Sequence, residues 1–278
     1  MIRATCAGRI VTATIDNPPI NLLTRELMSE LICLSKELAD DRDTLVFVLK
    51  SGNPDFFLAH FDIAAILDFP IDGAAERPDL ADSAYHAMCE RFRTMDKVTI
   101  AQIEGRIGGA GSELAMHFDM RFGVIGRTVI NQMEVPLGIL PGGTGTQRMP
   151  HLIGRPRALE VILGGGDLDA GTAEQWGYLN RALPQADMAA HIDALSRRIA
   201  SYPPEAVRLA KAAVDAAYLP DAQGAVEEVF LFRQLLRTNE ARRNMTRFLE
   251  IGGQTREGEL RIEELNALLG CPPERPAQ

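Results

Sequence analysis

The sequence predicts an α/β protein, and three features support this fold class. A β-branched run at 10–15 and a continuous apolar run at 44–49 enclose a helical pattern that begins after Thr24, which gives strand, helix and strand. A further buried strand is expected at 98–103, where a glycine cluster and a second helix follow. Helices are then expected over most of residues 150–250.

Length and composition are those of a globular protein with a sizeable core. The 278 residues are 46% apolar and 24% charged, which excludes a disordered chain, a collagen-like chain and a coiled coil. This length suits one large domain, or one domain with an appendage. The formal net charge of −9 argues against nucleic acid or an anionic membrane as the main partner, since both attract clustered Lys and Arg.

Cysteine, histidine and hydropathy patterns bear on cofactors and compartment. The four cysteines lie far apart, so neither a disulfide framework nor a zinc ribbon is expected, and Cys33 is expected as a small core residue of its helix. The five histidines show no paired metal spacing, so no metal is expected. The N-terminus lacks a signal-peptide pattern and the apolar runs are too short to span a bilayer, which predicts a soluble, cytoplasmic protein.

The first elements follow from local patterns. The strand at 10–15 closes on Asp16-Asn-Pro-Pro, which predicts a turn. Thr24 is expected to cap a helix in which apolar residues such as Leu27 and Leu31 recur at helical spacing. The run at 44–49 is short, branched and apolar throughout, which favours a buried parallel strand.

The middle of the chain continues the alternation of loops, helices and strands. Residues 70–82 combine proline, glycine and charge, which predicts a surface loop, and a helix is expected at 85–95. The strand at 98–103 should be followed by a helix at 112–117 and by another strand at 120–124.

The densest glycine cluster lies at 105–111, before the expected helix. A dinucleotide fingerprint would need glycine where Leu114 stands, and neither this cluster nor the glycine-rich segment at 142–146 has the Gly-Lys-Ser/Thr of a phosphate loop. Two interpretations stay open at this point. The glycines could allow close packing of a helix on a strand, or they could bring helix-start amides close enough to stabilise an oxyanion.

Glu113 and Glu134 are the candidate acid–base residues. They lie 21 positions apart, too far for one helix face but compatible with two loops that meet at one end of a sheet. Two carboxylates around one water can divide the roles of general acid and general base. Spacing alone favours the plainer interpretation, in which Glu113 is stabilised in the first turn of its helix and Glu134 is a solvated loop acid.

His60 lies in an apolar segment at 56–67. A lone histidine in such a setting is more often a satisfied core residue than a catalyst. Asp62 is expected to cap a short helix at 63–67, which places the Phe61 amide beside a second helix start. The Gly-x-Ser-x-Gly pattern of a nucleophilic serine is absent.

Five segments, taken in order, carry a resemblance to a known family. They are IDNPPINLL at 15–23, FLAHFDI at 57–63, AQIEGRIGGAGSELA at 101–115, EVPLGILPGGTGTQR at 134–148, and a glycine and alanine pattern at 153–180. Together they resemble the crotonase superfamily, the enoyl-CoA hydratases and isomerases, over about residues 10–250.

The resemblance implies a crotonase-like spiral of ββα units with a helical C-terminal trimerisation region. It implies a catalytic core at 1–195 and a helical oligomerisation region at 196–278, assembled as a homotrimer or a dimer of trimers. The implied substrate is an acyl-CoA thioester, in which coenzyme A is part of the substrate. No further cofactor is implied, and neither nucleic acid nor a membrane is expected as a partner.

Mapped residue by residue, the resemblance implies an oxyanion hole formed by the backbone amides of Phe61 and Ala110. It implies Glu113 as the base on a water molecule and Glu134 as the carrier of the α-proton. Substrate contacts are implied at Leu22, Ala59, His60, Asp62, Ile63, Gly109, Met133 and Gly142. His60 and Ala110 replace family glycines and Met133 replaces a proline, and His60 is weighed as a steric change in the pocket against a polar contact to an unusual acyl group.

Retention of both glutamates favours an enoyl-CoA hydratase, which adds water across the 2,3 double bond in syn fashion. Isomerases of the family can manage with a single acid/base at the second position. A Δ3-Δ2 enoyl-CoA isomerase, another lyase or hydrolase of acyl-CoA on the same fold, and an inactive acyl-CoA-binding subunit remain alternatives.

Overall fold

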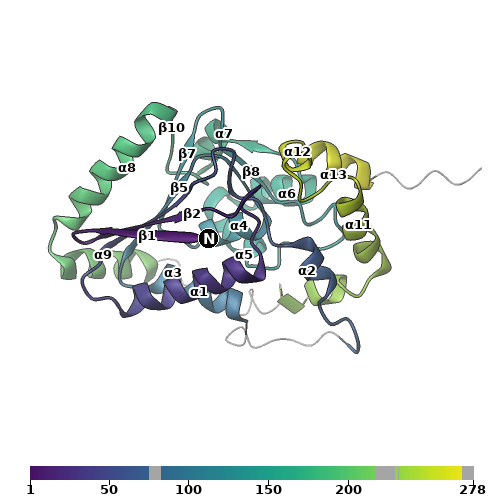
Figure 1. Ribbon diagram of the computed structural model, residues 1–278, viewed down its shortest axis with the longest axis horizontal. Helices are drawn as coiled ribbons and strands as arrows, with labels where there is room; N and C mark the ends of the chain where they lie inside the picture. Colours follow the sequence, from purple (N-terminus) through teal and green to yellow (C-terminus); the bar gives the residue numbers. More distant parts are fainter. Residues whose placement is uncertain (75–82, 217–228, 231, 271–278) are drawn as a thin grey trace, which may run out of the picture.

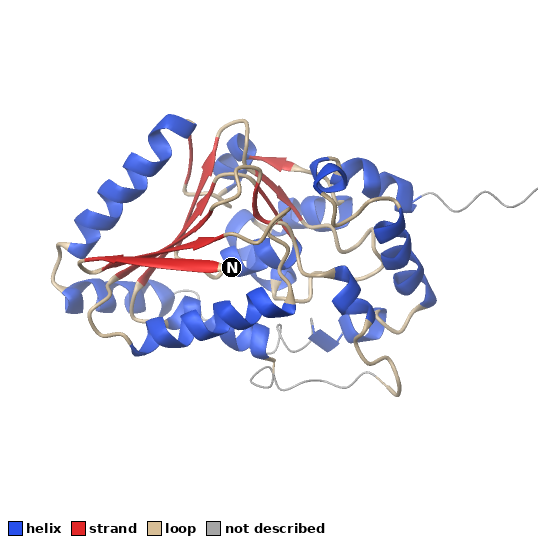
Figure 2. Ribbon diagram, in the orientation of Figure 1, coloured by secondary structure: helices blue, strands red, loops and turns tan. Residues whose placement is uncertain are grey.

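The computed structural model describes residues 1–74, 83–216, 229–230 and 232–270. Two β-sheets occupy the middle of the molecule and helices surround them (Figure 1, Figure 2). Of the surface loop expected at 70–82, the part at 75–82 lies outside the described residues.

The larger sheet has six strands in the order β1-β2-β3-β5-β7-β10. These strands are β1 (Ile2–Ala7), β2 (Ile10–Ile15), β3 (Val46–Ser51), β5 (Val98–Ile103), β7 (Met120–Val124) and β10 (Arg181–Leu183). β1 pairs antiparallel with β2, and the other neighbours are parallel. The expectation of buried parallel strands is therefore confirmed for β3 and β5, whose apolar runs fit burial on both faces.

The smaller sheet repeats a simple unit. Its four strands, in the order β4-β6-β8-β9, are β4 (Phe56–Leu58), β6 (Arg106–Gly108), β8 (Val129–Asn131) and β9 (Leu168–Asp169). β3, β5 and β7 are each followed in the chain by a strand of this sheet and then by a helix, namely α2 (Ile63–Leu67), α4 (Gly109–Ala115) or α5 (Gly145–Ile153). The chain thus makes three ββα units, and the spiral implied by the resemblance is confirmed.

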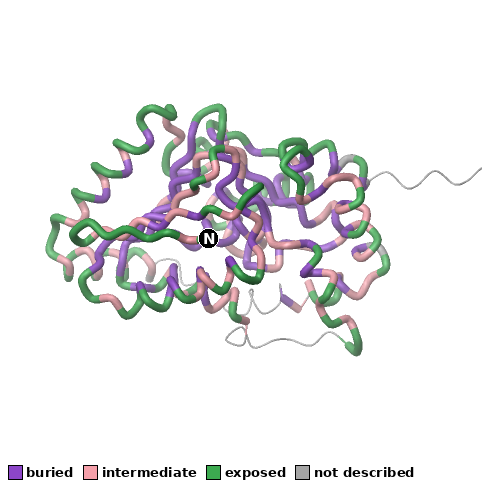
Figure 3. Tube along the Cα trace, in the orientation of Figure 1, coloured by how far each residue is buried: buried purple, intermediate pink, exposed green. Residues whose placement is uncertain are grey.

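The main core lies between the larger sheet and two helices. α1 (Arg25–Asp40) begins after Thr24, whose hydroxyl accepts a hydrogen bond from the Leu27 amide at 3.2 Å, as predicted. α3 (Ala84–Thr94) packs against α1, and the buried face of α1 consists of Leu27, Leu31, Leu34, Ser35 and Leu38. Burial of each such leucine contributes about 1.5–3 kcal/mol, and Figure 3 shows the buried segments gathered in the sheets.

Helices also cover the two ends of the molecule. α8 (Gln185–Ala200) and α9 (Pro204–Ala216) lie at one end, and α11 (Asn239–Glu250), α12 (Arg256–Leu260) and α13 (Ile262–Gly270) lie at the other (Figure 1). Two further helices, α6 (Arg155–Gly164) and α7 (Ala170–Trp176), follow α5 in the chain. No helix among the described residues is long and apolar enough to cross a membrane.

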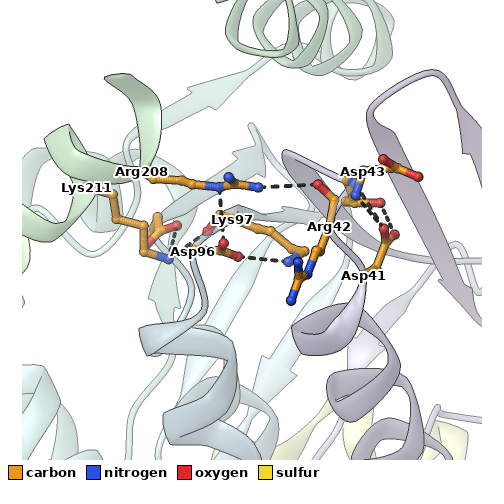
Figure 4. A network of polar contacts seen from close by, with 9 residues as sticks. Asp41, Arg42, Asp43, Asp96, Lys97, Arg208 and Lys211 are labelled. Carbon is orange, nitrogen blue, oxygen red and sulfur yellow. Dashed lines mark hydrogen bonds and ion pairs between the residues drawn. The ribbon is translucent and has the colours of Figure 1, made fainter. Parts of the chain in front are cut away.

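Ion pairs attach α9 to the start of β5 (Figure 4). Lys211 donates to the Lys97 carbonyl at 2.7 Å and to Asp119 at 2.9 Å. Lys97 is itself buried and donates to Asp96 at 2.8 Å, and Arg208 contacts the same carboxylate at 3.1 Å. The charged face of α9 is thus anchored on the sheet through paired groups.

The C-terminal helices pack beside α2 and the segment at 133–139. Their shared apolar cluster contains Ile63, Ile66, Met133, Leu137, Ile139, Leu236, Ala241, Met245, Phe248, Ile262, Leu265 and Leu269. This packing brings α11, α12 and α13 next to the segment that contains His60 and Phe61.

Several expectations need correction or stay open. Cys33 is exposed, because it lies on the outer face of α1. α4 begins at Gly109 rather than at 112, so Glu113 lies in the second helical turn instead of the first. β1, β4, β6, β8, β9 and β10 were not predicted. The expected division at 195/196 falls inside α8 and stays a prediction.

Candidate active site

A cavity of about 850 Å³ lies where α2, α3, α4 and the C-terminal helical region meet. Eight of the predicted site residues line it: His60, Phe61, Ile63, Ala110, Glu113, Met133, Glu134 and Gly142. Apolar side chains such as Phe69, Leu137 and Phe232 form much of the remaining wall. Its size and its few convergent polar groups are typical of a small-molecule site.

A second cavity of about 720 Å³ lies beside α9 and is lined by Arg121, Tyr202 and Lys211 among others. None of the predicted site residues lines this second cavity. The first cavity is therefore the candidate active site.

Glu113 is held at the base of the first cavity by backbone amides. One carboxylate oxygen, Oε1, accepts hydrogen bonds from the amides of Gly143 at 2.8 Å and Gly145 at 2.7 Å. The side chain is buried, and burial raises the pKa of Glu113 to about 7 although these two amides oppose the shift. A carboxyl with this pKa can both accept and donate a proton near neutral pH.

Thr144 lies between those two glycines in a left-handed conformation, with φ of 81°. This conformation is an outlier for a β-branched residue. His117 contacts the Thr144 hydroxyl through Nε2 at 3.1 Å and the Glu113 carbonyl through Nδ1 at 2.8 Å. Burial holds the pKa of His117 well below its ordinary value, so the neutral ring donates from Nδ1 and accepts the Thr144 hydroxyl at Nε2.

Glu134 reaches the same cavity from the turn that follows β8. Its carbonyl accepts the amides of Leu137 at 3.0 Å and Ile139 at 3.1 Å, which closes the turn, and the residue is buried. Gly109 has φ of 44°, and a Cβ at that position would lie 3.0 Å from Glu134 Oε1. The glycine therefore lets α4 start directly against this carboxylate.

Tyr85 lies close to both acids. Its hydroxyl donates to the Ala110 carbonyl at 2.6 Å. Burial raises the pKa of Tyr85 well above 10, and Cys89, Glu113 and Glu134 add to the shift. The structure thus brings the two carboxylates, one from α4 and one from a turn, around one phenol and one cavity.

The Phe61 amide points away from the neighbouring strand. The Leu23 amide donates to the His60 carbonyl at 2.9 Å, and the Asp62 amide donates to the Leu23 carbonyl at 3.2 Å. Because a trans peptide directs its C=O and N–H to opposite sides, the Phe61 N–H faces away from Leu23. Asp62 caps α2 by accepting the Ala64 amide at 2.9 Å, as predicted.

Ala110 is the second residue of α4, so its amide belongs to the first turn, which has no intrahelical acceptor. Phe61 and Ala110 both line the cavity that contains the acids. The residues that carry these two amides therefore line the same cavity as the two acids, and the oxyanion role of the amides stays a prediction.

His60 is a buried and fully engaged histidine. Its Nδ1 lies 2.8 Å from the Phe61 carbonyl and its Nε2 lies 2.9 Å from Oε1 of Glu259. Both ring nitrogens are therefore used by the protein, which leaves neither of them for the polar acyl contact that the sequence left open. His60 is among the residues that line the cavity, although its side chain is only 2% exposed.

Four predicted substrate contacts do not line the cavity. Leu22 packs on a small apolar cluster that includes Ala59. Asp62 caps α2, and Gly109 packs against the Glu134 carboxylate. Their substrate contacts stay predictions. Among the described residues, no group of three or more His, Cys, Asp or Glu side chains is placed to hold a metal ion.

The sequence interpretation missed several residues of the site. It included 134–148 among the family segments and named Gly142 as a substrate contact, but it gave no role to the Gly143 and Gly145 amides that bind Glu113. Tyr85 and Glu259 gave no local pattern, because their partners lie 25 and 199 positions away.

Comparison with known proteins agrees with this geometry. The family described as enoyl-CoA hydratase/isomerase matches residues 6–256. The Mycobacterium bovis protein named "Probable enoyl-CoA hydratase echA8" is 30% identical over 87% of this chain and 92% of its own length. The "Short-chain-enoyl-CoA hydratase" of Clostridium acetobutylicum is 26% identical, with the same coverage of 87% and 92%.

A solved structure also resembles this chain. The crystal structure of a "putative enoyl-CoA hydratase" from Streptomyces avermitilis superposes with a TM-score of 0.88, at 32% identity, and covers 96% of each chain. The match spans nearly the whole molecule, including the ββα units and the residues that line the cavity. The chain therefore belongs to the enoyl-CoA hydratase/isomerase family.

Proposed function

We propose that this protein is an enoyl-CoA hydratase that adds water to a 2-enoyl-CoA thioester. One observation carries the proposal: the buried residues Glu113 and Glu134 line the same cavity as Phe61 and Ala110, whose backbone amides are the proposed oxyanion donors. Relatives named as enoyl-CoA hydratases support the same activity.

In the proposed reaction the thioester carbonyl accepts hydrogen bonds from the Phe61 and Ala110 amides. These bonds strengthen as enolate charge develops on the oxygen, so they stabilise the transition state more than the substrate. Glu113 takes a proton from water while the water oxygen bonds to C3, and Glu134 gives a proton to C2. Return of the proton from Glu113 to Glu134 through solvent completes the cycle, and no cofactor besides the CoA of the substrate takes part.

The pKa of Glu113, raised to about 7, suits this role because the group then changes protonation near neutral pH. Its Oε1 is occupied by the Gly143 and Gly145 amides, so Oε2 is the oxygen that would receive the proton. The carboxylate is thereby oriented before substrate binds.

Hydration of crotonyl-CoA, followed by the loss of the conjugated enoyl absorbance, tests the proposal. Glu113→Gln and Glu134→Gln should each lower kcat by about 10²-fold or more, the scale of general acid–base catalysis. Glu160→Gln, an exposed change on α6, is the matched control and should leave kcat unchanged. Unchanged hydration in both active-site variants would refute the assignment.

Two other activities are separated by the same experiment. A 3-enoyl-CoA assayed in parallel measures double-bond isomerisation, which needs one proton carrier, whereas retention of both acids favours hydration. Tight binding of acyl-CoA with no turnover of either substrate would instead identify a binding subunit.

Assembly and location are part of the proposal. The family resemblance and the exposed apolar side chains of α9, Leu209 and Val214, support a homotrimer or a dimer of trimers, which light scattering in solution tests. The free thiols of Cys6 and Cys33 are exposed, which suits a reducing compartment such as the cytoplasm, and cell fractionation tests this location.

A further inference from the structure

A buried ion pair joins the C-terminal region to the segment that contains the Phe61 amide. His60 Nε2 lies 2.9 Å from Oε1 of Glu259, and the two side chains are only 2% and 3% exposed. The partners are 199 residues apart in the sequence. A charged pair buried this deeply is costly unless each of its polar atoms has a hydrogen-bond partner.

The contacts require a proton on each nitrogen of the His60 ring. The Phe61 carbonyl, 2.8 Å from Nδ1, can only accept. Oε1 of Glu259 also accepts the Gln254 amide at 2.7 Å, so it acts as an acceptor toward Nε2 as well. With Glu259 ionised, which its lowered pKa favours, both ring nitrogens donate and His60 is an imidazolium.

The protonation equilibria agree with this assignment. Burial disfavours a charged ring, but the Glu259 carboxylate outweighs this effect with help from Asp62, and the pKa of His60 is raised above 6.5. Burial also opposes ionisation of Glu259, but His60 and the Gln254 amide outweigh it, and the pKa of Glu259 is lowered below 4.5.

Gln254 provides a second attachment between the same two segments. Its side-chain oxygen accepts the Ile63 amide at 2.7 Å, and its side-chain nitrogen donates to Asp62 at 3.0 Å. The segment that presents these groups is compact, because a Cβ on Gly258 would lie 2.0 Å from the Gly252 carbonyl. Residues 60–63 are thus held at several atoms by residues 254–259.

These contacts fix both peptide planes that flank Phe61. The Leu23 amide holds the His60 carbonyl at 2.9 Å, and the His60 imidazolium holds the Phe61 carbonyl at 2.8 Å. With both planes held, the direction of the Phe61 N–H is set by the C-terminal region as well as by the bridge to Leu23.

We propose that Glu259, acting through His60, is a positioning residue for the Phe61 amide, so that the segment at 254–259 completes the oxyanion site. This inference rests on the proposed role of Phe61 in the hydratase reaction. The buried His60 side chain then has a function, because it is the link from the Phe61 segment to α12.

The test compares two isosteric changes on one helix. Glu259→Gln removes the buried carboxylate, whereas Glu257→Gln, the control, removes the neighbouring exposed one, whose side chain is 85% exposed. We expect Glu259→Gln to lower kcat for crotonyl-CoA about tenfold, because the donor is displaced rather than lost, with KM changed less than about twofold. The control should match the wild type in both constants.

A second measurement does not depend on turnover. Bound acetoacetyl-CoA, a β-keto thioester whose enolate absorbs in the near ultraviolet, reports how well the site stabilises an oxyanion. Its enolate fraction should fall in Glu259→Gln and stay unchanged in Glu257→Gln. If Glu259→Gln does not fold, Gln254→Ala breaks the second attachment and should give the same direction of change.

The outcomes separate the two proposals. A wild-type protein that neither hydrates crotonyl-CoA nor stabilises the bound enolate would overturn the proposed function. An active wild type with the same kcat and enolate fraction in Glu259→Gln would overturn only the positioning role, even if the melting temperature falls. An equal loss in Glu257→Gln would also overturn it, because the effect would then not be specific to the buried pair.

Discussion

Glu113→Gln is expected to stabilise the fold at alkaline pH while it removes most of the activity. Burial raises the pKa of Glu113 from 4.5 to about 7, so the folded protein binds this proton more tightly than the unfolded chain does. The difference corresponds to about 3 kcal/mol at about 1.4 kcal/mol per pH unit. Glutamine has the same shape, can still accept the Gly143 and Gly145 amides at its oxygen, and carries no charge to bury.

The sign of the pH dependence makes this prediction specific. Below about pH 4.5 the carboxyl is protonated in both states, so burial of charge costs nothing. As the pH rises from about 4.5 through about 7, the wild type loses stability relative to the glutamine variant, and the full difference is present at pH 8. Stability is thus lost as pH rises, the opposite of a carboxylate whose pKa is lowered by folding.

Urea unfolding at pH 8 and at pH 4.5 measures the effect. We expect Glu113→Gln to exceed the wild type by about 3 kcal/mol at pH 8, or about 5 °C in melting temperature for a chain of this length, and by much less at pH 4.5. Glu160→Gln, which is exposed on α6, should change neither value. Equal stabilities at pH 8, or the same gain at both pH values, would refute the reasoning.

Three further substitutions test the packing of the site and the core. Gly143→Ala places a Cβ 2.6 Å from Oε2 of Glu113, so kcat for crotonyl-CoA should fall about tenfold or more in a steady-state assay. Gly109→Ala combines φ of 44° with a Cβ 3.0 Å from Glu134, and urea unfolding should show a loss of about 1–2 kcal/mol together with lower kcat. Arg121→Met leaves buried carbonyls without their donor and should cost about 2–4 kcal/mol in unfolding free energy, with kcat of the folded enzyme unchanged.

Local patterns were sufficient to predict much of the fold. The cap at Thr24, the cap at Asp62 and the buried strands β3 and β5 were all identified from the sequence, because each depends on neighbouring residues. β6 has three residues and β9 has two, which is too short for a period of two to be visible. β1 is mostly exposed and pairs only with β2, so its apolar pattern is weak.

The site was predictable only in part, for a physical reason. The order of the family segments placed Glu113 and Glu134 on α4 and on the turn after β8, and both line one cavity. Other groups of the site come from distant segments: Gly143, which binds Glu113, is 30 positions from it, and Tyr85 is 25 positions from Ala110. Helical and strand periodicity relates only residues a few positions apart, so it cannot predict contacts between residues this far apart in the sequence.

Backbone strain among the described residues marks the same segments. Three non-glycine residues there have a left-handed conformation: Asn21 with φ of 52°, Thr144 with 81° and Gln254 with 62°. Such conformations cost about 1–3 kcal/mol each and persist only where the surroundings hold them. The conformation of Asn21 is stabilised by its own side chain, whose nitrogen donates to the Phe56 carbonyl at 3.2 Å and to the Phe57 carbonyl at 3.1 Å.

Each of these three residues lies in or binds a segment next to the candidate active site. Asn21 fixes the end of β4, which leads to Phe61; Thr144 lies between the two amides that bind Glu113. Gln254 binds the start of α2 just after Phe61. Because a backbone amide has no side chain with which to adjust its direction, it can be aimed only by fixing the chain on both sides, and that requirement accounts for strain at these loops rather than in the sheets.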